Sequence, residues 1–476
     1  MSSCGKGRLS PATGAILMFA LSMMSLAASA EPSPPKVQLV TIAPGHFHAA
    51  LVQKTQIPGV SNTVHVYGEP GFDLAEHIKR VGAYNSRIDS PTQWTMEIHA
   101  ASDFVIRMKA ERAGNVAVIS GRNRGKLDLV KAALEANMHV LVDKPWIIEA
   151  SDFPQLAAVL SLAESKHLIA ADIMTERFEV TNALAQALVA SPDVFGTLAK
   201  GSPERPSIYF EDVHHFMKWV SGRPNVRPDW FFDSTQQGEG LADTGTHLVD
   251  LVQWMLAPAR AIPLEEIVVL SARRWPTRIT PAQFESVTGT KAFPAFLAGN
   301  VKQGALEVFA NTQITYRIAG IHVSLAAMWD WEAKPGSGDW KSFVITGSQS
   351  RIEVRQGARE KYRSELFVRP VTKAATASVG DALRTRIAAL SDRFPGLTIE
   401  QKNGEFRVAV PDALRSGHEA HFAEVTRVFL DHVKHPATRA AWENANLLSK
   451  YFTTTAGTTL SQTMSTATVT FRRKTR

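Results

Sequence analysis

The stretch VAVISGRNRGKLDLVKAALEANMHVLVDKP, residues 116–145, contains two apolar runs separated by a helical pattern. The first run, Val116 to Ile119, stops at Ser120-Gly121, where a turn is expected. From Lys126 to Asn137 apolar side chains recur at helical spacing, and Asn137 can close the helix in a left-handed conformation. Val140 to Val142 is again continuously apolar, as in parallel strands covered on both faces. The stretch therefore predicts a strand, a helix and a second parallel strand.

The tripeptide Asp143-Lys144-Pro145 follows the second strand directly. Open parallel sheets bind ligands at the carboxyl ends of their strands, so Lys144 is expected at a ligand site. The unit resembles the glucose-fructose oxidoreductase and inositol dehydrogenase family (Gfo/Idh/MocA), whose members have Glu-Lys-Pro here. The resemblance implies that Lys144 reaches both a nicotinamide cofactor and the substrate hydroxyl, while Pro145 rigidifies the chain leaving the cofactor domain.

Composition describes an ordinary soluble protein. At 476 residues, with 45% hydrophobic and 20% charged residues, the chain is long enough for two or three domains. The net charge of +7 is dispersed along the chain, so no nucleic-acid partner is expected. Cys4 is the single cysteine, and it lies in a predicted leader. The mature chain would then have no disulfide, cysteine metal site or cysteine nucleophile.

Residues 1–30 have the features of a Sec-type signal peptide. Lys6 and Arg8 form a positive start, Ala15 to Leu26 is mostly apolar, and Ala28-Ser29-Ala30 supplies small residues for cleavage. We predict cleavage after Ala30 and a periplasmic or secreted protein. A membrane anchor is the alternative, but the apolar run is shorter than the roughly 20 residues that span a bilayer. No stable membrane insertion is therefore expected after cleavage.

The predicted first strand, Val37 to Ile42, leads into a turn where dinucleotide-binding folds have a glycine-rich motif. Of G-x-G-x-x-G only the middle glycine is present, and Pro44 removes one backbone donor. The histidines of this turn could contact phosphate or substrate, or could be partly buried loop residues. The predicted cofactor-binding residues of the turn are Gly45, His46, Phe47 and His48.

Two more candidates for cofactor binding lie further along the chain. Glu69 follows the predicted second strand, Val64 to Tyr67, near the spacing at which an acidic residue binds the adenine ribose. An exposed turn glutamate would show the same pattern. The family has Thr-Pro-Asn where this sequence has Gly121-Arg122-Asn123, and the resemblance gives Asn123 a contact with the cofactor ribose. The family's usual histidine three residues later is Lys126 here.

Beyond about Glu179 the pattern changes to successive strands with glycine-rich turns, which predict a mainly antiparallel sheet. We predict a Rossmann-like dinucleotide-binding domain over 31–178 and an α+β substrate domain with a large open sheet over 179–476. That sheet could also form a homo-oligomer. Residues 374–392 are predicted as a mobile insertion, and helices at 418–435 and 442–451. The predicted strands are Ile267–Ala272, Ala305–Ala310, Ile321–Leu325, Ser342–Ile345, Arg351–Val354, Glu365–Val368 and Phe406–Val410.

The stretch from Gly238 to Leu251 carries a second motif. Apolar residues at helical spacing predict a helix beginning near Asp243, which places Asp243 and His247 on one face. The family has Asp-x-Gly-x-His-x-x-Asp here, and the match is complete. In relatives the aspartate and histidine bind sugar hydroxyls, and the histidine often accepts the proton. The alternative is that Asp243 is a helix N-cap and His247 a core histidine.

Two segments of the second half, Glu211 to Lys218 and Arg227 to Asp233, combine aromatic rings with carboxylates and imidazoles. Such side chains suit the apolar faces and hydroxyl rim of a sugar, so we interpret these segments as substrate-binding. The histidines of this half could instead hold a metal, but their spacing follows no established ligand pattern. His418-Glu419-Ala420-His421 is one residue short of H-E-x-x-H, so no metal is expected. The predicted substrate-binding residues are Arg177, which stands where many relatives have an arginine, with His214, His215, Trp230, Asp243 and His247.

Alcohol oxidation removes a proton from oxygen and a hydride from carbon, so it needs a base at the hydroxyl and a nearby cation. His247 is the predicted base, Lys144 the cation, and Asp243 orients the substrate. We therefore predict an oxidoreductase acting on a carbohydrate or polyol with NAD or NADP. NAD-dependent glycoside hydrolysis, which uses the same hydride step in this family, is one alternative. A non-catalytic periplasmic sugar-binding protein that lost the cofactor turn is another.

Overall fold

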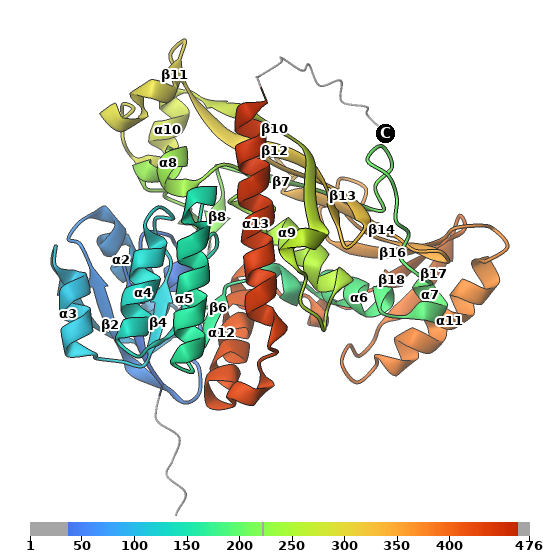
Figure 1. Ribbon diagram of the computed structural model, residues 1–476, viewed down its shortest axis with the longest axis horizontal. Coiled ribbons are helices and arrows are strands. Elements are labelled where there is room, and N and C mark those ends of the chain that lie inside the picture. Colours follow the sequence, from blue (N-terminus) through green and yellow to red (C-terminus); the bar gives the residue numbers. More distant parts are fainter. Residues whose placement is uncertain (1–36, 221–222, 465–476) are drawn as a thin grey trace, which may run out of the picture. The chain divides into compact units, whose positions relative to one another are not determined.

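Six parallel strands form the sheet of the N-terminal half, in the order β3-β2-β1-β4-β5-β6 (Figure 1). The computed structural model describes residues 37–220 and 223–464, so the predicted signal peptide lies outside the described residues. The strands are β1 Val37–Ile42, β2 Val60–Gly68, β3 Thr95–Ala100, β4 Val116–Ile119, β5 His139–Val142 and β6 Ala170–Asp172. The helices between them are α1 His48–Val52, α2 Phe72–Ser86, α3 Phe104–Glu111, α4 Lys126–Glu135 and α5 Phe153–Ser165.

Neighbouring residues of the central strands pack into different cores, which explains their continuous apolar runs. Leu39 of β1 packs with α1 and α2, whereas Val40 packs with α3, α4 and α5. Asn137 closes the turn after α4 at φ 63°, as predicted. The order of the sheet reverses between β1 and β4, and the crevice at such a point binds ligands in open α/β folds.

The second half contains a ten-stranded mixed sheet, ordered β10-β12-β13-β7-β14-β15-β16-β18-β17, with β11 paired to β12. Its pairs are antiparallel except for β13 with β7, so the predicted fold class is confirmed. The strands are β7 Ile208–His215, β10 Ile267–Ile279, β11 Val301–Lys302, β12 Ala305–Ile318, β13 Ile321–Asp330, β14 Trp340–Thr346, β15 Ser350–Gln356, β16 Glu365–Pro370, β17 Thr398–Lys402 and β18 Glu405–Ala409. A small hairpin joins β8 Trp219–Val220 to β9 Arg223–Pro224.

Some helices of the second half pack against the ten-stranded sheet, and two pack against the N-terminal half. α6 (Val180–Val189), α7 (Pro192–Phe195) and α9 (Thr244–Leu256) contribute to the core of the second half. α12 (His418–Lys434) packs its Phe422 with α1, and α13 (Trp442–Thr463) places Tyr451 in the core beside α5. Figure 1 shows α13 running beside both α5 and α9. The remaining helices of this half are α8 Ser234–Gln237, α10 Pro281–Thr288 and α11 Thr376–Ala389.

The structure differs from the sequence predictions at two of these elements. Strand β7 was not predicted, because its polar residues were interpreted as a binding segment, although it lies inside the sheet. The predicted mobile insertion contains α11, an ordered helix whose buried face includes Val379 and Leu383.

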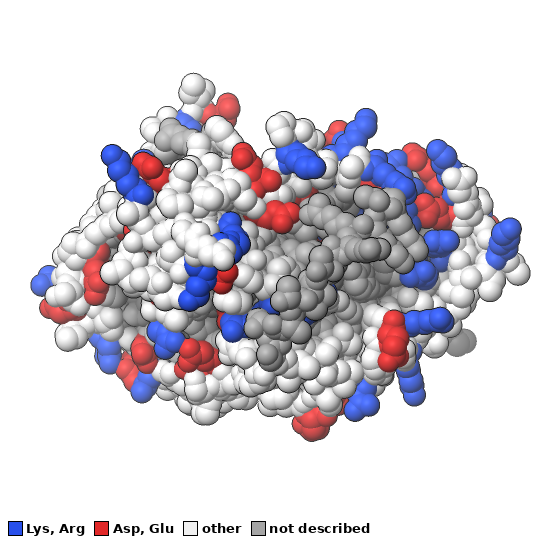
Figure 2. Space-filling view, turned by 90° about the horizontal axis from the view of Figure 1, so that it is seen from above, with Lys and Arg blue, Asp and Glu red and all other residues white. Residues whose placement is uncertain are grey.

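Charges of both signs are interspersed over the molecular face shown in Figure 2, as the dispersed charge of the sequence suggests. Among the described helices, none combines the length and apolarity needed to cross a bilayer.

Candidate functional site

Lys144 and Asp243 meet where the two sheets come together. Lys144 follows β5 at the carboxyl edge of the first sheet, and Asp243 precedes α9. The Lys144 ammonium forms an ion pair with the Asp243 carboxylate and donates to the Asp243 carbonyl oxygen at 3.1 Å. Burial would raise the pKa of Asp243, but the charge of Lys144 holds it well below its usual range. Asp243 makes no capping hydrogen bond to α9, because its side chain is committed to Lys144.

His247 lies one helical turn after Asp243 and lines the same cavity. Burial, followed by the charge of Lys144, lowers the pKa of His247 to about 4, so the imidazole is neutral near pH 7. Its Nδ1 atom is buried and has no hydrogen-bond partner among the described residues. A neutral imidazole beside an ammonium group can accept a proton from a bound hydroxyl.

A cavity of about 910 Å³, here called the central cavity, brings residues of both halves together. The N-terminal half contributes the turn after β1 and Lys144. The C-terminal half contributes β7, the start of α9 and the segment that begins α12. The predicted residues that line it are His46, Phe47, His48, Lys144, His214, His215, Asp243 and His247.

His214 and Asp339 form the centre of a charged network on one wall of the central cavity. The Nδ1 atom of His214 lies 3.1 Å from Asp339, and its Nε2 atom 3.1 Å from Asp212. Burial would lower the pKa of His214, but Asp212 and Asp339 raise it to about 9. Asp339 also accepts from His215 at 2.7 Å. At neutral pH the cavity therefore carries an imidazolium on β7 and a neutral imidazole on α9.

His46 and His48 both point at Asp143. Their Nδ1 atoms lie 3.4 Å and 3.0 Å from one carboxylate oxygen of Asp143, which also accepts from Ser120 at 2.8 Å. Burial lowers the pKa of both imidazoles, and they hold the pKa of Asp143 well below its usual range. By the spacing of their ligand atoms these residues could hold a metal ion, and so could a second group formed by His65, Glu97 and His99.

A second cavity of about 890 Å³, the outer groove, lies at the carboxyl ends of β1 and β2. Glu69 at the end of β2 lines it and is exposed, with no ion-pair partner among the described residues. Arg122, just after β4, lines the same groove. An acidic acceptor and a cation at these strand ends fit the ribose and the phosphates of a dinucleotide.

The turn after β1 offers few free amides. Gly45 and His46 both donate their backbone N–H to the Ser120 carbonyl, at 3.1 and 3.2 Å. A Cβ on Gly45 would lie 2.9 Å from the Asp73 carboxylate and 3.1 Å from the Trp230 ring. The turn is therefore packed against side chains where a glycine-rich motif would face phosphate.

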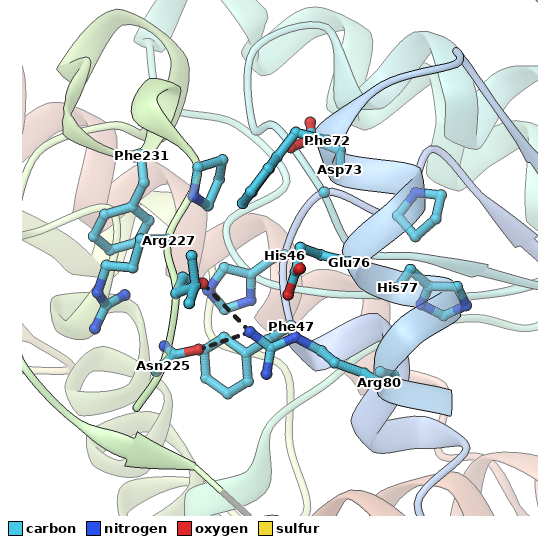
Figure 3. Close-up of a pocket in the computed structure, with 15 residues that line it drawn as sticks. His46, Phe47, Phe72, Asp73, Glu76, His77, Arg80, Asn225, Arg227 and Phe231 are labelled. Carbon is cyan, nitrogen blue, oxygen red and sulfur yellow. Dashed lines mark hydrogen bonds between the residues drawn. The ribbon is translucent and has the colours of Figure 1, made fainter. Parts of the chain in front are cut away.

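Figure 3 shows the narrow pocket beside this turn. The loop carrying Asn225, Arg227 and Phe231 faces helix α2 and the His46-Phe47 segment. Arg80 of α2 spans the gap, because it donates to the Asn225 side chain at 3.2 Å and to the Val226 carbonyl at 3.3 Å.

Besides Gly45 and Glu69, which line the other two pockets, four predicted site residues do not line the central cavity. Arg177 was predicted to bind substrate, but its Nε and Nη2 atoms donate to the two oxygens of the Asp250 carboxylate, at 2.6 and 2.7 Å. Trp230 instead lines the outer groove, and its indole N–H donates to Asp73 at 2.9 Å. Asn123 and Pro145 were predicted to bind cofactor, yet the Asn123 amide donates to the Gln237 carbonyl at 2.6 Å.

Lys126 explains the position of Asn123 and Pro145. Its buried ammonium donates to the Asn123 side chain at 2.6 Å and to the carbonyls of Asp143 and Pro145 at 2.8 and 2.9 Å. Burial lowers the pKa of Lys126 to about 8. Lys126 therefore holds the tripeptide that carries Lys144, a role that the sequence did not reveal.

The sequence also left several cavity residues unidentified. Glu176 lines the central cavity 3.4 Å from Lys341, whose charge overcomes the effect of burial and lowers the carboxyl pKa. Asp339 and Arg227 line it as well. None of these residues belongs to a sequence motif. Arg227, however, stands in an aromatic, proline-containing loop, and that composition could have indicated a binding loop.

Residues 184–462, more than half of the chain, match the family model described as "Putative oxidoreductase C terminal domain". The chain belongs to this oxidoreductase family. The predicted Gfo/Idh/MocA-type resemblance is confirmed at this level. A solved "putative oxidoreductase" from Parabacteroides merdae, similar over 90% of this chain and 98% of its own, has 40% sequence identity and a TM-score of 0.87.

Other solved structures share the fold of this chain at low identity. Levoglucosan dehydrogenase in complex with NADH is 15% identical, with 90% of this chain and 97% of its own covered and a TM-score of 0.56. GenD2 from gentamicin A biosynthesis, in complex with NAD, is 14% identical, with 90% and 95% covered and a TM-score of 0.55. A comparison with curated proteins finds no match.

Proposed function

We propose that this oxidoreductase oxidises a hydroxyl group of a carbohydrate or polyol, with NAD or NADP as the hydride acceptor. The observation that carries the proposal is the convergence of Lys144, Asp243 and His247, from both halves, on the central cavity. Support comes from structural neighbours that are complexes with NAD or NADH, one of which also holds levoglucosan.

The chain's own residues can hold the groups that the reaction needs. Glu69 and Arg122 would hold the cofactor in the outer groove, and the bound nicotinamide would take the hydride. Lys144 would donate a hydrogen bond to the reacting hydroxyl and stabilise negative charge on its oxygen. Asp243 fixes the ammonium, and neutral His247 would accept the hydroxyl proton.

The test is reduction of NAD or NADP by the purified mature chain, followed at 340 nm with a panel of sugars and polyols. Reduction by wild type and its loss in His247→Gln support the proposal. Absence of reduction together with absence of cofactor binding at millimolar NAD or NADP would contradict it.

A non-catalytic sugar-binding protein is the second candidate, and the turn after β1 favours it. Gly45 and His46 donate their backbone N–H groups to the Ser120 carbonyl, so these groups are not available to a phosphate. The Asp73 carboxylate also lies beside Gly45, where it would repel phosphate. Sugar binding by calorimetry without any cofactor binding would select this candidate.

Export through the predicted signal peptide and assembly through the open sheet belong to the same proposal. Val268 and Leu270 of β10 are 38% and 40% exposed, which leaves apolar surface on that sheet for a second copy. Cell fractionation tests export, and light scattering on the purified mature chain tests assembly.

A further inference from the structure

Arg227 differs from the other basic residues of the central cavity. It is only 3% exposed, yet it has no ion-pair partner among the described residues. Every other lysine or arginine that lines this cavity has a carboxylate within 4.0 Å: Lys54 has Glu419, Lys144 has Asp243, Lys218 has Asp339, Lys341 has Glu176, Arg363 has Asp412 and Arg415 has Glu365.

The contacts of Arg227 fix its guanidinium but leave its fork free. Nε donates to the Phe216 carbonyl at 3.0 Å. The guanidinium carbon lies 4.3 Å from the centre of the Phe231 ring and 5.2 Å from that of Trp329. Within the described chain the two terminal amino groups donate to no acceptor. A guanidinium packed against two rings, with its terminal amino groups free, is prepared for a bidentate oxyanion.

Arg227 lines the central cavity. Phe231 and Trp329, the rings that hold it, both line that cavity. Burial lowers the pKa of Arg227 to about 10, so it stays charged, and the carboxylates that act on it through space, Asp243 and Asp339, line the cavity too. Because they lie beyond ion-pair distance and already have their own cations, the buried charge remains uncompensated.

We infer that Arg227 binds a carboxylate of the substrate, so that the substrate is a sugar acid, such as a uronate or an aldonate. This inference rests on the proposed function and adds the substrate class. The acid group would lie against Arg227, while the reacting hydroxyl contacts Lys144 and His247. Each charge would then have a counterion in the complex, and a neutral sugar would leave Arg227 buried and unpaired.

Arg227 also lines the outer groove, so a cofactor phosphate is another source of the same oxyanion chemistry. The experiment therefore has two arms, both by calorimetry on the mature chain. One arm titrates D-galacturonate, D-glucuronate and D-gluconate against D-galactose, D-glucose and D-sorbitol without cofactor. The other titrates NAD and NADP.

Wild type should bind at least one acid about 30-fold or more tightly than its neutral counterpart, as expected for a buried charge pair. Arg227→Met should remove that difference while NAD affinity stays within twofold. Arg227→Lys keeps the charge without the fork, so it should show an intermediate preference even if the methionine variant fails to fold. Arg363→Met is the matched control, because it removes one charge at the same cavity from a residue that has a carboxylate partner. Its acid preference should equal that of wild type.

Equal or tighter binding of neutral sugars by wild type overturns the inference. Three other results would also overturn it. They are an acid preference that survives in Arg227→Met, a wild type that binds none of the acids, and an Arg227→Met variant that loses only NAD affinity. An absence of NAD reduction would count against the proposed oxidation but would leave the sugar titrations valid.

Discussion

The ion pair of Lys144 and Asp243 joins residues 99 positions apart, and its removal should affect catalysis and stability separately. Lys144→Met should lower kcat by about 10²–10³-fold, because the developing alkoxide loses its cation. It should also reduce the free energy of unfolding by about 3 kcal/mol, since Asp243 is left charged and largely buried. Rates at 340 nm and urea unfolding measure the two effects.

The double variant Lys144→Met with Asp243→Asn is the control for that experiment. It removes both charges, so it should recover most of the lost stability without recovering activity. Recovery of activity in the double variant would show that Lys144 is structural.

Removal of Arg177 should affect stability but not substrate binding, because its Nε and Nη2 atoms already bind the two oxygens of the Asp250 carboxylate. Arg177→Met should reduce the free energy of unfolding by about 2 kcal/mol, as expected for lost hydrogen bonds between charged groups. Lys450 still reaches Asp250 at 2.9 Å, which limits the loss. Sugar affinity measured by calorimetry should stay within twofold of wild type. A large fall in affinity with unchanged stability would restore the predicted substrate role.

At the level of elements, the start of α9 depends on a close approach at Gly240. A Cβ there would lie 2.1 Å from the Ala310 carbonyl oxygen of β12, which cannot move alone because it belongs to the sheet. Gly240→Ala should therefore cost about 2 kcal/mol or more and displace Asp243 from Lys144. Gly299→Ala is the matched control, since nothing lies within 4 Å of its Cβ position. Equal melting temperatures for the two variants would contradict this account.

The sequence predicted those elements whose pattern is local. The buried strands β4 and β5, the helix between them and the start of α9 follow from apolar spacing, and the family motifs identified Lys144 and Asp243. Strand β7 was missed because its sequence, IYFEDVHH, lacks the regular alternation of a half-buried strand, and its polar residues were assigned to ligand binding. Helix α11 was missed because its buried face contacts Phe406 far along the chain.

Arg177 and Arg227 show why site residues are harder to predict than elements. A guanidinium has the same sequence signal whether a carboxylate neutralises it or not. Arg177 meets Asp250 through folding, whereas among the described residues the Arg227 guanidinium meets aromatic rings and a carbonyl but no carboxylate. The difference depends on tertiary contacts that no local spacing encodes.

For the whole molecule, buried histidines should make stability depend on pH. Burial lowers the pKa of His77 and His418 to about 3 and that of His247 to about 4. The unfolded chain binds these protons near pH 6.5, so this stability is present above pH 6.5 and is lost as the pH falls through the folded values. His214, with its pKa raised to about 9, contributes in the opposite direction, fully below pH 6.5 and progressively less as the pH rises through 9.

His77→Leu tests this expectation away from the central cavity, because both ring nitrogens of His77 are buried without a partner in the described structure. Between pH 6 and 4.5 the unfolding free energy of wild type should fall more steeply than that of the variant, by up to about 1.4 kcal/mol per pH unit. Urea unfolding at several pH values measures the slopes. Parallel curves would show that His77 is not kept neutral by burial.

Helix α13 belongs to both cores. Tyr451 packs with the first sheet, and one turn and a half later Gly457 lies so close to Leu241 that a Cβ would approach it to 2.5 Å. A chain that ends before this helix lacks contacts in both cores, including the one with Leu241, two residues ahead of Asp243. A product truncated before residue 442 should therefore fail to hold Asp243 against Lys144 and should be inactive.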